Sequence, residues 1–346
     1  MVHRYLGSLY LKYIFLILFS LVLFFVGLDF VQALKSLPSS ASLQILYAVY
    51  RFFHGVDVLF PISLVFAMIS LKLHLIRSNE LVAFYAAGYS KKALIRPLFL
   101  IAIVLTFFYL VLHMTSFSYA DEYAKNIRKF HTFVSSTKNL FFKYKESYVY
   151  FDELIPLQKS AKRVRIFELN SSGGSELSSL ILAKKAAFHQ ESWHLPNATV
   201  VKKLPHKIAI LSKDIDTLQG YRPTILDSVY EGKTAISLLD AIYAFRLFKK
   251  QHIRTKKIEA VILYQLFFPF FAPFLMVIIF YFVPVTARLG NLGLFSFGAM
   301  LAALITWGLL YALAKLAFTE AIDPVIAIVL PQVLLFAAAL WFYKKF

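Results

Sequence analysis

The sequence predicts a polytopic α-helical membrane protein with six transmembrane helices, arranged as two sets of three on either side of an inserted β-domain. The first observation is the order of apolar and polar segments: three long apolar runs precede a polar block, and three more follow it. The run lengths agree, since about 20 apolar residues let a helix cross roughly 30 Å of hydrocarbon. Composition agrees too: 59% of the residues are hydrophobic and only 16% are charged, which excludes a soluble globular protein.

The expected spans follow the apolar runs in order. A stretch at 42–54 carries Arg51 and His54 among apolar residues, and we expect it to be an interfacial lead-in to the second span. Pro269 and Pro273 should kink the fourth span, because proline cannot donate a backbone hydrogen bond. The six predicted spans are 13–34, 56–71, 97–117, 258–283, 292–318 and 324–343.

The distribution of Lys and Arg predicts the orientation. Short cytoplasmic loops carry an excess of these residues, whereas long domains are translocated regardless of charge. With the N-terminus inside, the basic residues gather on the cytoplasmic side, the C-terminus is also cytoplasmic, and the polar block 120–251 lies outside. The residues on the inner side are Arg4, Lys12, Lys72, Arg77, Lys91, Lys92, Arg96, Arg288, Lys344 and Lys345.

The net charge of +18 has two possible explanations. The excess of Lys and Arg can serve as topology signals and contacts to lipid headgroups, or it can attract an anionic cargo. The chain has no cysteine, which excludes disulfides, iron–sulfur clusters and thiol nucleophiles.

Inside the polar block the apolar pattern changes to period two. Short alternating stretches separated by turn residues predict strands, and their spacing is typical of a β-sandwich or jelly roll. From 234 to 248 the apolar residues recur at helical spacing, with Thr234 as the expected N-cap. The predicted strands are 147–152, 163–169, 179–188, 192–195 and 199–204.

No catalytic or metal-binding motif is found. Gly232, Lys233 and Thr234 resemble the end of a phosphate-binding loop, but the motif needs a glycine where Asp227 stands. The histidines lack metal-ligand spacing. We therefore expect no catalytic residue, no metal and no cofactor, and any ATP hydrolysis must come from a partner.

The loop between the second and third spans predicts a short helix at 77–90. Ser78 or Asn79 is the expected cap, Glu80 complements the positive end of the helix dipole, and Gly88 ends the helix. Its apolar face must lie on lipid or enter a groove of another protein, and the acidic Glu80 favours the protein. The face consists of Leu81, Val82, Phe84 and Tyr85.

Charged residues near the membrane are costly and often functional. Asp29 lies near the outer end of the first span with Lys35 just beyond it, and Asp57 begins the second span. A local ion pair between Asp29 and Lys35 is the structural alternative to a binding role.

Several segments together resemble the LptF/LptG (YjgP/YjgQ) family of lipopolysaccharide export permeases, in order along the whole chain. They are RSNELVAFYAAGYS at 77–90, LAKKAAFHQESWHL at 182–195, FPFFAP at 268–273, FVPVTARLG at 282–290, and Pro324 with Leu330 and Pro331. The stretch LDFVQAL at 28–34 is closer to the LptG branch.

The resemblance implies a non-catalytic permease in the inner membrane. It implies four partners besides the membrane: a homologous second permease, a dimeric cytoplasmic ABC ATPase, a periplasmic jellyroll bridge protein, and lipopolysaccharide; no nucleic acid is expected. Spans 1 and 5 would line lateral gates for the lipid. The implied domains are 1–119 with a coupling helix at 77–90, a periplasmic β-jellyroll at 120–233, a connecting helix at 234–253, and 254–346.

The resemblance also implies site residues. The coupling helix would contact the ATPase through Glu80, Leu81, Phe84, Tyr85 and Gly88. In family members a basic residue near the outer end of span 1 meets the phosphates of the lipid. This chain has Asp29 at that position, which is therefore a candidate lipid-binding position. The contact with the phosphates would then be displaced to Lys35 or made by the partner permease. In the β-domain, Tyr148 and Phe188 are the expected lipid-binding positions.

Two rival functions remain open from sequence. A membrane-anchored periplasmic sensor or assembly scaffold would use the spans only as anchors, so that Glu80 and its apolar neighbours would be dispensable. A membrane enzyme is disfavoured by the lack of any metal or nucleophile motif.

Overall fold

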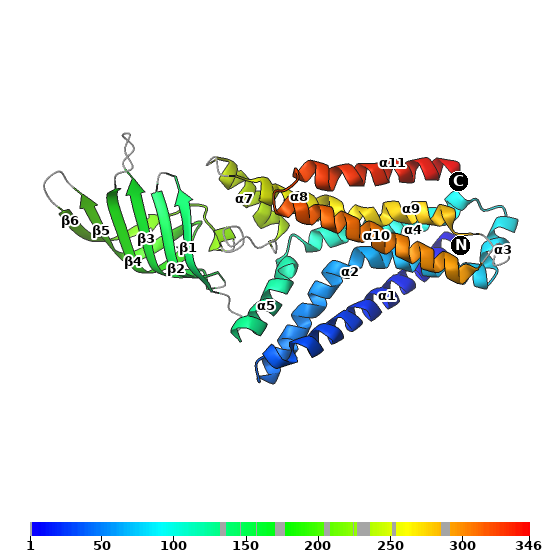
Figure 1. The fold of residues 1–346 in the computed structure, drawn as a ribbon, viewed down its shortest axis with the longest axis horizontal. Coiled ribbons are helices and arrows are strands. Elements are labelled where there is room, and N and C mark those ends of the chain that lie inside the picture. The colour runs from blue at the N-terminus through cyan, green and yellow to red at the C-terminus, as the bar shows by residue number, and fades with distance from the viewer. Residues whose placement is uncertain are drawn as a thin grey trace. The chain divides into compact units, whose positions relative to one another are not determined.

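The computed structural model describes residues 2–131, 136–145, 147–156, 158–169, 177–203, 208–223, 225–226, 236–250, 254–284 and 291–346. The chain forms two compact units, which are described separately (Figure 1). Unit 1 comprises 1–35, 48–120 and 256–346, and unit 2 comprises 36–47 and 121–255.

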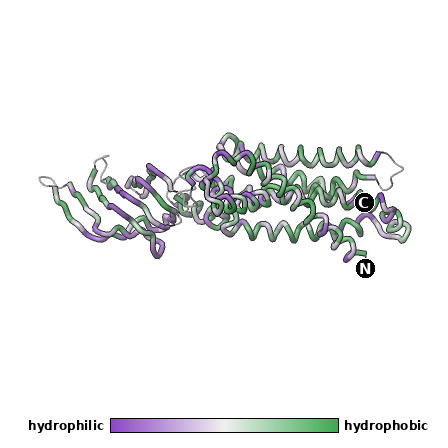
Figure 2. Tube along the Cα trace, turned by 90° about the horizontal axis from the view of Figure 1, so that it is seen from below, coloured by the Kyte–Doolittle hydropathy of each residue, from purple (hydrophilic) through white to green (hydrophobic). Residues whose placement is uncertain are grey.

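The described residues contain six helical segments that are long and apolar enough to cross a membrane, which confirms the predicted six spans. The hydropathy colouring of Figure 2 follows them as continuous hydrophobic stretches. They are α1 (Val2–Ala33) with the 3₁₀ turn η1 (Leu34–Ser36), α2 (Ala41–Arg77), α4 (Lys91–Leu112), α8 (Lys256–Phe267) with α9 (Phe271–Phe282), α10 (Leu292–Phe318), and η5 (Val325–Val329) with α11 (Leu330–Lys345).

The stretch at 42–54, predicted as an interfacial lead-in to the second span, is helical and forms the first turns of the 37-residue helix α2. Its interfacial position stays a prediction. A Cβ atom at Gly55 would lie 2.9 Å from Cδ1 of Phe25 and 3.2 Å from Cγ1 of Val22, so the glycine makes room for α1. Helix α2 therefore packs closely on α1 at this point.

Prolines interrupt two spans. The predicted kink of the fourth span is a 3₁₀ turn, η3 (Phe268–Phe270), which contains Pro269 and separates α8 from α9. In the sixth span a π-helical segment, η5, immediately precedes α11. Pro331 lacks an N–H and its ring crowds the carbonyl of the residue four positions earlier, which explains the wider turn there.

Helix α2 is the centre of unit 1. In the most apolar 18-residue stretch of α2, 72% of the residues are buried, whereas the corresponding fractions are 11% for α1 and 17% for α10. The hydroxyl of Tyr10 in α1 donates to the carbonyl oxygen of Leu64 in α2 at 2.9 Å and lies 3.1 Å from the sulfur of Met276 in α9. Three helices are thus joined through one buried tyrosine, while most of the surface of α1 and α10 is left open.

Lys72 is buried inside unit 1 rather than exposed in a loop. Its side chain comes from α2 and is 2% exposed. The ammonium donates to the carbonyl oxygens of Phe280 at 2.5 Å and Val283 at 2.7 Å, and it lies 4.1 Å from the centre of the Phe280 ring. Carbonyls at the end of a helix have no intrahelical partner, so Lys72 satisfies those at the end of α9.

Unit 2 contains a six-stranded antiparallel sheet, which confirms the inserted β-domain. Each described strand pairs with its neighbour in sequence, in the order of a meander, as Figure 1 shows. The strands are β1 (Thr137–Tyr144), β2 (Ser147–Ile155), β3 (Ser160–Leu169), β4 (Leu177–His189), β5 (Ser192–Lys203) and β6 (Ile208–Thr217).

Two helices flank the sheet in sequence. The 3₁₀ turn η2 (Ser116–Tyr119) leads into α5 (Ala120–Phe130), and α7 (Leu238–Lys250) returns the chain toward unit 1. The predicted helix from 234 begins instead at Leu238, because Ser237 accepts a hydrogen bond from the Asp240 amide at 3.2 Å. The predicted cap Thr234 lies outside the described residues, as do Gly232 and Lys233.

One face of the sheet carries the core of unit 2. Trp193 is fully buried, its ring centre lies 5.0 Å from that of Phe151, and its indole nitrogen donates to the Tyr221 carbonyl oxygen at 2.7 Å. Tyr221 in turn stacks on Phe142 at 5.4 Å between ring centres. The segment after β6 is thus fastened to this face of the sheet.

Replacing Lys72 by methionine should destabilise unit 1. The Lys72→Met variant removes both donors and leaves the end of α9 with unpaired carbonyls, at a cost of about 1–3 kcal/mol in the free energy of unfolding. Thermal unfolding of the purified protein in detergent measures the effect. The exposed Lys12→Met is the matched control, and equal transition temperatures for both variants would contradict the role of Lys72.

Candidate functional site

The short helix after α2 is α3 (Glu80–Ala86), with seven residues rather than the predicted three turns. The expected side-chain caps are wrong. Asn79 adopts a left-handed conformation, with φ 59°, and makes no capping bond, while the hydroxyl of Ser78 donates to the His74 carbonyl oxygen at 3.1 Å. Gly88 does end the helix in the left-handed region, with φ 85°, as expected.

Helix α3 is fastened to unit 1 along one side. Leu81 is fully buried, and Phe84 and Tyr85 pack against the same hydrophobic core. Glu80 accepts a hydrogen bond from the hydroxyl of Tyr5 in α1 at 2.8 Å. These contacts attach α3 both to α1 and to the hydrophobic core of unit 1.

Tyr85 contributes a buried polar atom to this attachment. Burial raises the pKa of its phenol to about 12, so the ring stays neutral at physiological pH. Its hydroxyl has no hydrogen-bond partner among the described residues.

The other side of α3 faces outward. Val82 is 39% exposed, and Ala83, Ala86 and Ala87 are exposed as well. This outward face is small, apolar and free of bulky side chains, which suits close approach of another surface. Of the predicted contact residues, Glu80 lies at its edge, whereas Leu81 belongs to the core that holds the helix.

The end of unit 1 that carries α3 is basic. The start of α1, the end of α11 and α3 lie together at this end in Figure 1. Lys91 lies 5.5 Å from the ring centre of Tyr281, Lys92 lies 5.7 Å from that of Tyr343, and Lys345 lies 3.4 Å from that of Trp341. Lysines beside aromatic rings are typical of a membrane–water interface. Arg288, also expected here, lies outside the described residues.

The end of unit 1 away from α3 carries an ion pair that differs from the Asp29–Lys35 alternative. Asp29 pairs with Arg51 of α2, whose Nε donates to the carboxylate at 2.7 Å and whose second nitrogen also contacts it. The guanidinium also lies 5.2 Å from the ring centre of Phe25. The alternative of a local ion pair between Asp29 and Lys35 is therefore excluded, and Lys35 is exposed without an ion pair among the described residues.

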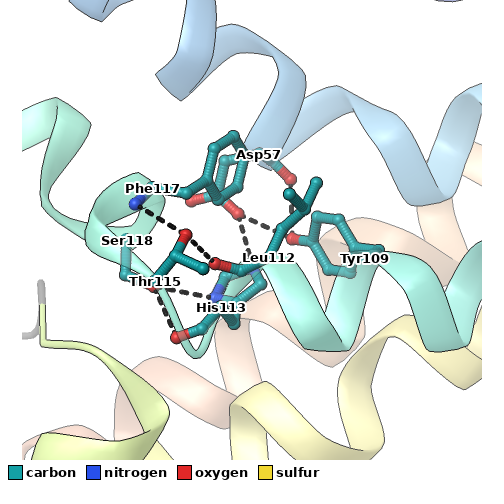
Figure 3. A network of polar contacts seen from close by, with 7 residues as sticks. All are labelled: Asp57, Tyr109, Leu112, His113, Thr115, Phe117 and Ser118. Atoms are coloured by element: carbon teal, nitrogen blue, oxygen red, sulfur yellow. Dashed lines mark hydrogen bonds and ion pairs between the residues drawn. The ribbon is translucent and has the colours of Figure 1, made fainter.

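A polar network joins α2 to the end of α4 (Figure 3). The hydroxyl of Tyr109 donates to the Asp57 carboxylate at 2.6 Å, and Nε2 of His113 lies 2.9 Å from the same oxygen. The hydroxyl of Ser118 lies 3.3 Å from Nδ1 of His113 and donates to the His113 carbonyl oxygen at 3.1 Å. From the sequence only Asp57 of this network stands out, because its partners lie more than 50 residues away.

The structure places the two expected lipid contacts of the β-domain on opposite faces of the sheet. Tyr148 stacks on Phe141 at 5.5 Å, on the face away from the buried Val149 and Phe151. Phe188 lies 5.6 Å from Trp193, on the face that carries the core. The two residues cannot line one continuous surface of this sheet.

The comparison with known families decides the identity. The chain matches the family model described as lipopolysaccharide export system permease LptF/LptG over residues 4–345. The chain belongs to this family. Comparison with curated proteins gives no match. The resemblance inferred from sequence is confirmed, and the preference for the LptG branch stays a prediction.

Membership of the LptF/LptG family, together with the six apolar helices, identifies a multi-pass inner-membrane protein of the lipopolysaccharide export system. A permease of this system is the membrane component of a transporter. The inserted β-domain agrees with the predicted architecture of the family.

The Asp29–Arg51 pair should stabilise the far end of α1 and α2. Both side chains are mostly buried, at 16% and 13% exposure, so Arg51→Ala leaves a poorly solvated carboxylate and should cost about 1–3 kcal/mol in the free energy of unfolding. The charge-swapped double variant Asp29→Arg with Arg51→Asp should recover much of this loss. Lys35→Ala is the control and should stay near wild type in thermal unfolding; a loss as large as that of Arg51→Ala would contradict the pairing.

Proposed function

We propose that this chain is the permease subunit of an ABC transporter that extracts lipopolysaccharide from the inner membrane and passes it to a periplasmic jellyroll bridge protein. A separate, dimeric cytoplasmic ABC ATPase supplies the energy, and this chain itself is non-catalytic. Membership of the permease family supports transport. The attachment of α3 supports the coupling to a motor.

The coupling step uses α3 as a rigid lever. Leu81 and the Tyr5–Glu80 hydrogen bond hold the helix to α1 and the core, and its outward face, at Val82, Ala83 and Ala86, enters a groove of the ATPase. Closure of the ATPase dimer then moves α1 and α2 together as a rigid body. Phe84, Tyr85 and Gly88 shape the helix in this proposal, and Glu80 both anchors it and borders the contact.

The orientation follows from the basic end of unit 1. Lys91, Lys92 and Lys345 gather there with α3, and the positive-inside rule assigns that end to the cytoplasm. Both termini are then cytoplasmic. The chain leaves unit 1 after α4, whose 22 residues extend about 33 Å away from α3, so the inserted domain is periplasmic. We assign residues 120–233 to this jellyroll domain and 234–253 to the connecting helix.

The open surfaces of α1 and α10 are assigned to the second permease and the cargo. Large apolar side chains cover both helices, including Phe15 at 71% and Leu294 at 69% exposure. A homologous permease facing these two helices would enclose an apolar cavity between the two chains, with lateral gates at α1 and α10. Lys35, exposed and without an ion pair among the described residues, is the basic group of this chain that we assign to the phosphates of the lipid.

The β-domain receives the lipid after extraction. The apolar face that includes Phe188 suits acyl chains, because burial of apolar surface drives their association. Tyr148, on the other face, is assigned to the sugar or headgroup side.

The substitution Val82→Asp tests the coupling step. It places a carboxylate on the outward face of α3 without touching the core, so the chain should fold but lose the ATPase in co-purification, with affinity falling at least about tenfold. ATP-driven release of lipopolysaccharide from proteoliposomes should fall in parallel. Ser78→Asp puts the same charge at an exposed position just before α3 and should leave both readouts unchanged.

The same experiment separates the rival function. A sensor or scaffold needs no motor, so retention of an ATPase by Val82→Asp, or an unchanged lipid release, would favour that reading over the permease.

A further inference from the structure

A basic groove crosses the β-sheet of unit 2 on the face that carries Tyr150. It has a volume of about 730 Å³ and runs over β3, β4 and β5. In register, Tyr150 pairs with Arg165, Arg165 with Leu182, and Leu182 with Thr199. The groove is lined by Arg163, Val164, Arg165, Leu182, Ala183, Lys184, Lys185, Pro196, Asn197 and Thr199.

The groove exists because the sheet is creased along one line. Arg163 in β3 and Asn197 in β5 adopt left-handed conformations, with φ 49° and φ 48°. The pairing of β5 with β6 shifts register between Leu195 and Ala198. Each irregularity turns its strand locally, and the strands that carry them lie on either side of β4, so both border the hollow.

Four positive side chains line this hollow, and only one is neutralised. Nε of Arg163 donates to the Asp152 carboxylate at 2.8 Å. Arg165, Lys184 and Lys185 are exposed and make no ion pair among the described residues. The guanidinium of Arg165 is held in place over the Tyr150 ring, 5.5 Å from its centre. Three unpaired charges in one groove attract an anion with more than one negative group.

The rest of the lining is mixed. Leu182 and Pro196 supply apolar surface between the basic groups, and Asn197 and Thr199 add polar groups. A ligand that fits carries phosphate groups on a body that is partly apolar, as a phosphorylated glycolipid does.

We propose that this groove binds the phosphate-bearing headgroup of the lipid cargo during its passage along the β-domain. The inference rests on the proposed function, since it names the part of the lipopolysaccharide that this face contacts. Arg165 makes a bidentate contact with a phosphate, and Lys184 and Lys185 neutralise its remaining charge. The acyl chains lie outside the groove.

The test uses the full chain in detergent and lipopolysaccharide as the probe. The double variant Arg165→Gln with Lys185→Gln should bind lipopolysaccharide at least about tenfold more weakly than wild type, since two charge-assisted contacts are lost. The control, Lys143→Gln with Lys202→Gln, removes two exposed lysines of the same sheet outside the groove and should bind like wild type. Thermal unfolding shows whether each variant folds, and Lys184→Gln alone provides a milder second variant.

The ligands in the assay distinguish the chemistry. Enzymatically dephosphorylated lipopolysaccharide should bind the wild type and the groove variant equally, and inorganic pyrophosphate should compete only with the phosphorylated lipid. If pyrophosphate binds as tightly as the lipid, the groove is a site for free phosphate and the proposal is overturned.

The outcomes also separate this inference from the proposed function. If the groove variant binds phosphorylated lipid like wild type while ATP-driven release from proteoliposomes persists, the groove assignment fails and transport stands. If wild type neither binds nor releases the lipid, both fail. An equal loss of lipopolysaccharide affinity in the groove and control variants would show that only the total positive charge of the sheet matters, and would overturn the proposed site.

Discussion

The absence of water in the hydrocarbon core is the constraint on which this structure depends. Backbone groups there must be satisfied within helices, and charges must be paired or moved to the ends. Three contacts in unit 1 illustrate this: Lys72 satisfies carbonyls at the end of α9, Asp29 is neutralised by Arg51, and Asp57 contacts a tyrosine and a histidine. The charged groups that appear costly in the sequence therefore join helices to one another.

The same constraint fits the lever role that we propose for α3. A seven-residue helix cannot cross the bilayer, so it lies at the basic end and is fixed by a buried leucine and a hydrogen bond to α1. In the proposed coupling, force on its outward face would pass to α1 and α2, because α2 is the most buried of the candidate spans and Tyr10 hydrogen-bonds α1 to it. The open surfaces of α1 and α10 would then change their environment as the bundle moves.

In the proposed function the β-domain receives a cargo that joins acyl chains to a charged headgroup. Its two faces differ accordingly. One carries the aromatic core around Phe151 and Trp193, and the other carries Tyr150 and Arg165 beside a basic groove. In our account the two faces serve the two parts of one molecule, which explains why Tyr148 and Phe188 point to opposite sides.

The sequence predicted the features that local periodicity determines. Six apolar runs, the change to period two, the proline interruption at Pro269 and the end of α3 at Gly88 all follow from the local properties of residues. Features that depend on distant contacts were missed or wrong. The partner of Asp29 is Arg51 and not the nearby Lys35, because two antiparallel helices bring them together. The close approach of Gly55 to Phe25 depends on how α2 packs on α1, and the left-handed conformation of Asn79 cannot be predicted from its neighbours in sequence.

The most direct measurement is single-cysteine labelling in intact cells, because the natural chain contains no cysteine and gives no background. Ser78→Cys, at the exposed position just before α3, should react with a membrane-impermeant thiol reagent only after the inner membrane is permeabilised. Lys213→Cys in the sheet should react once the outer membrane is opened. Labelling of both positions from the same side would contradict a cytoplasmic lever coupled to a periplasmic receiving domain.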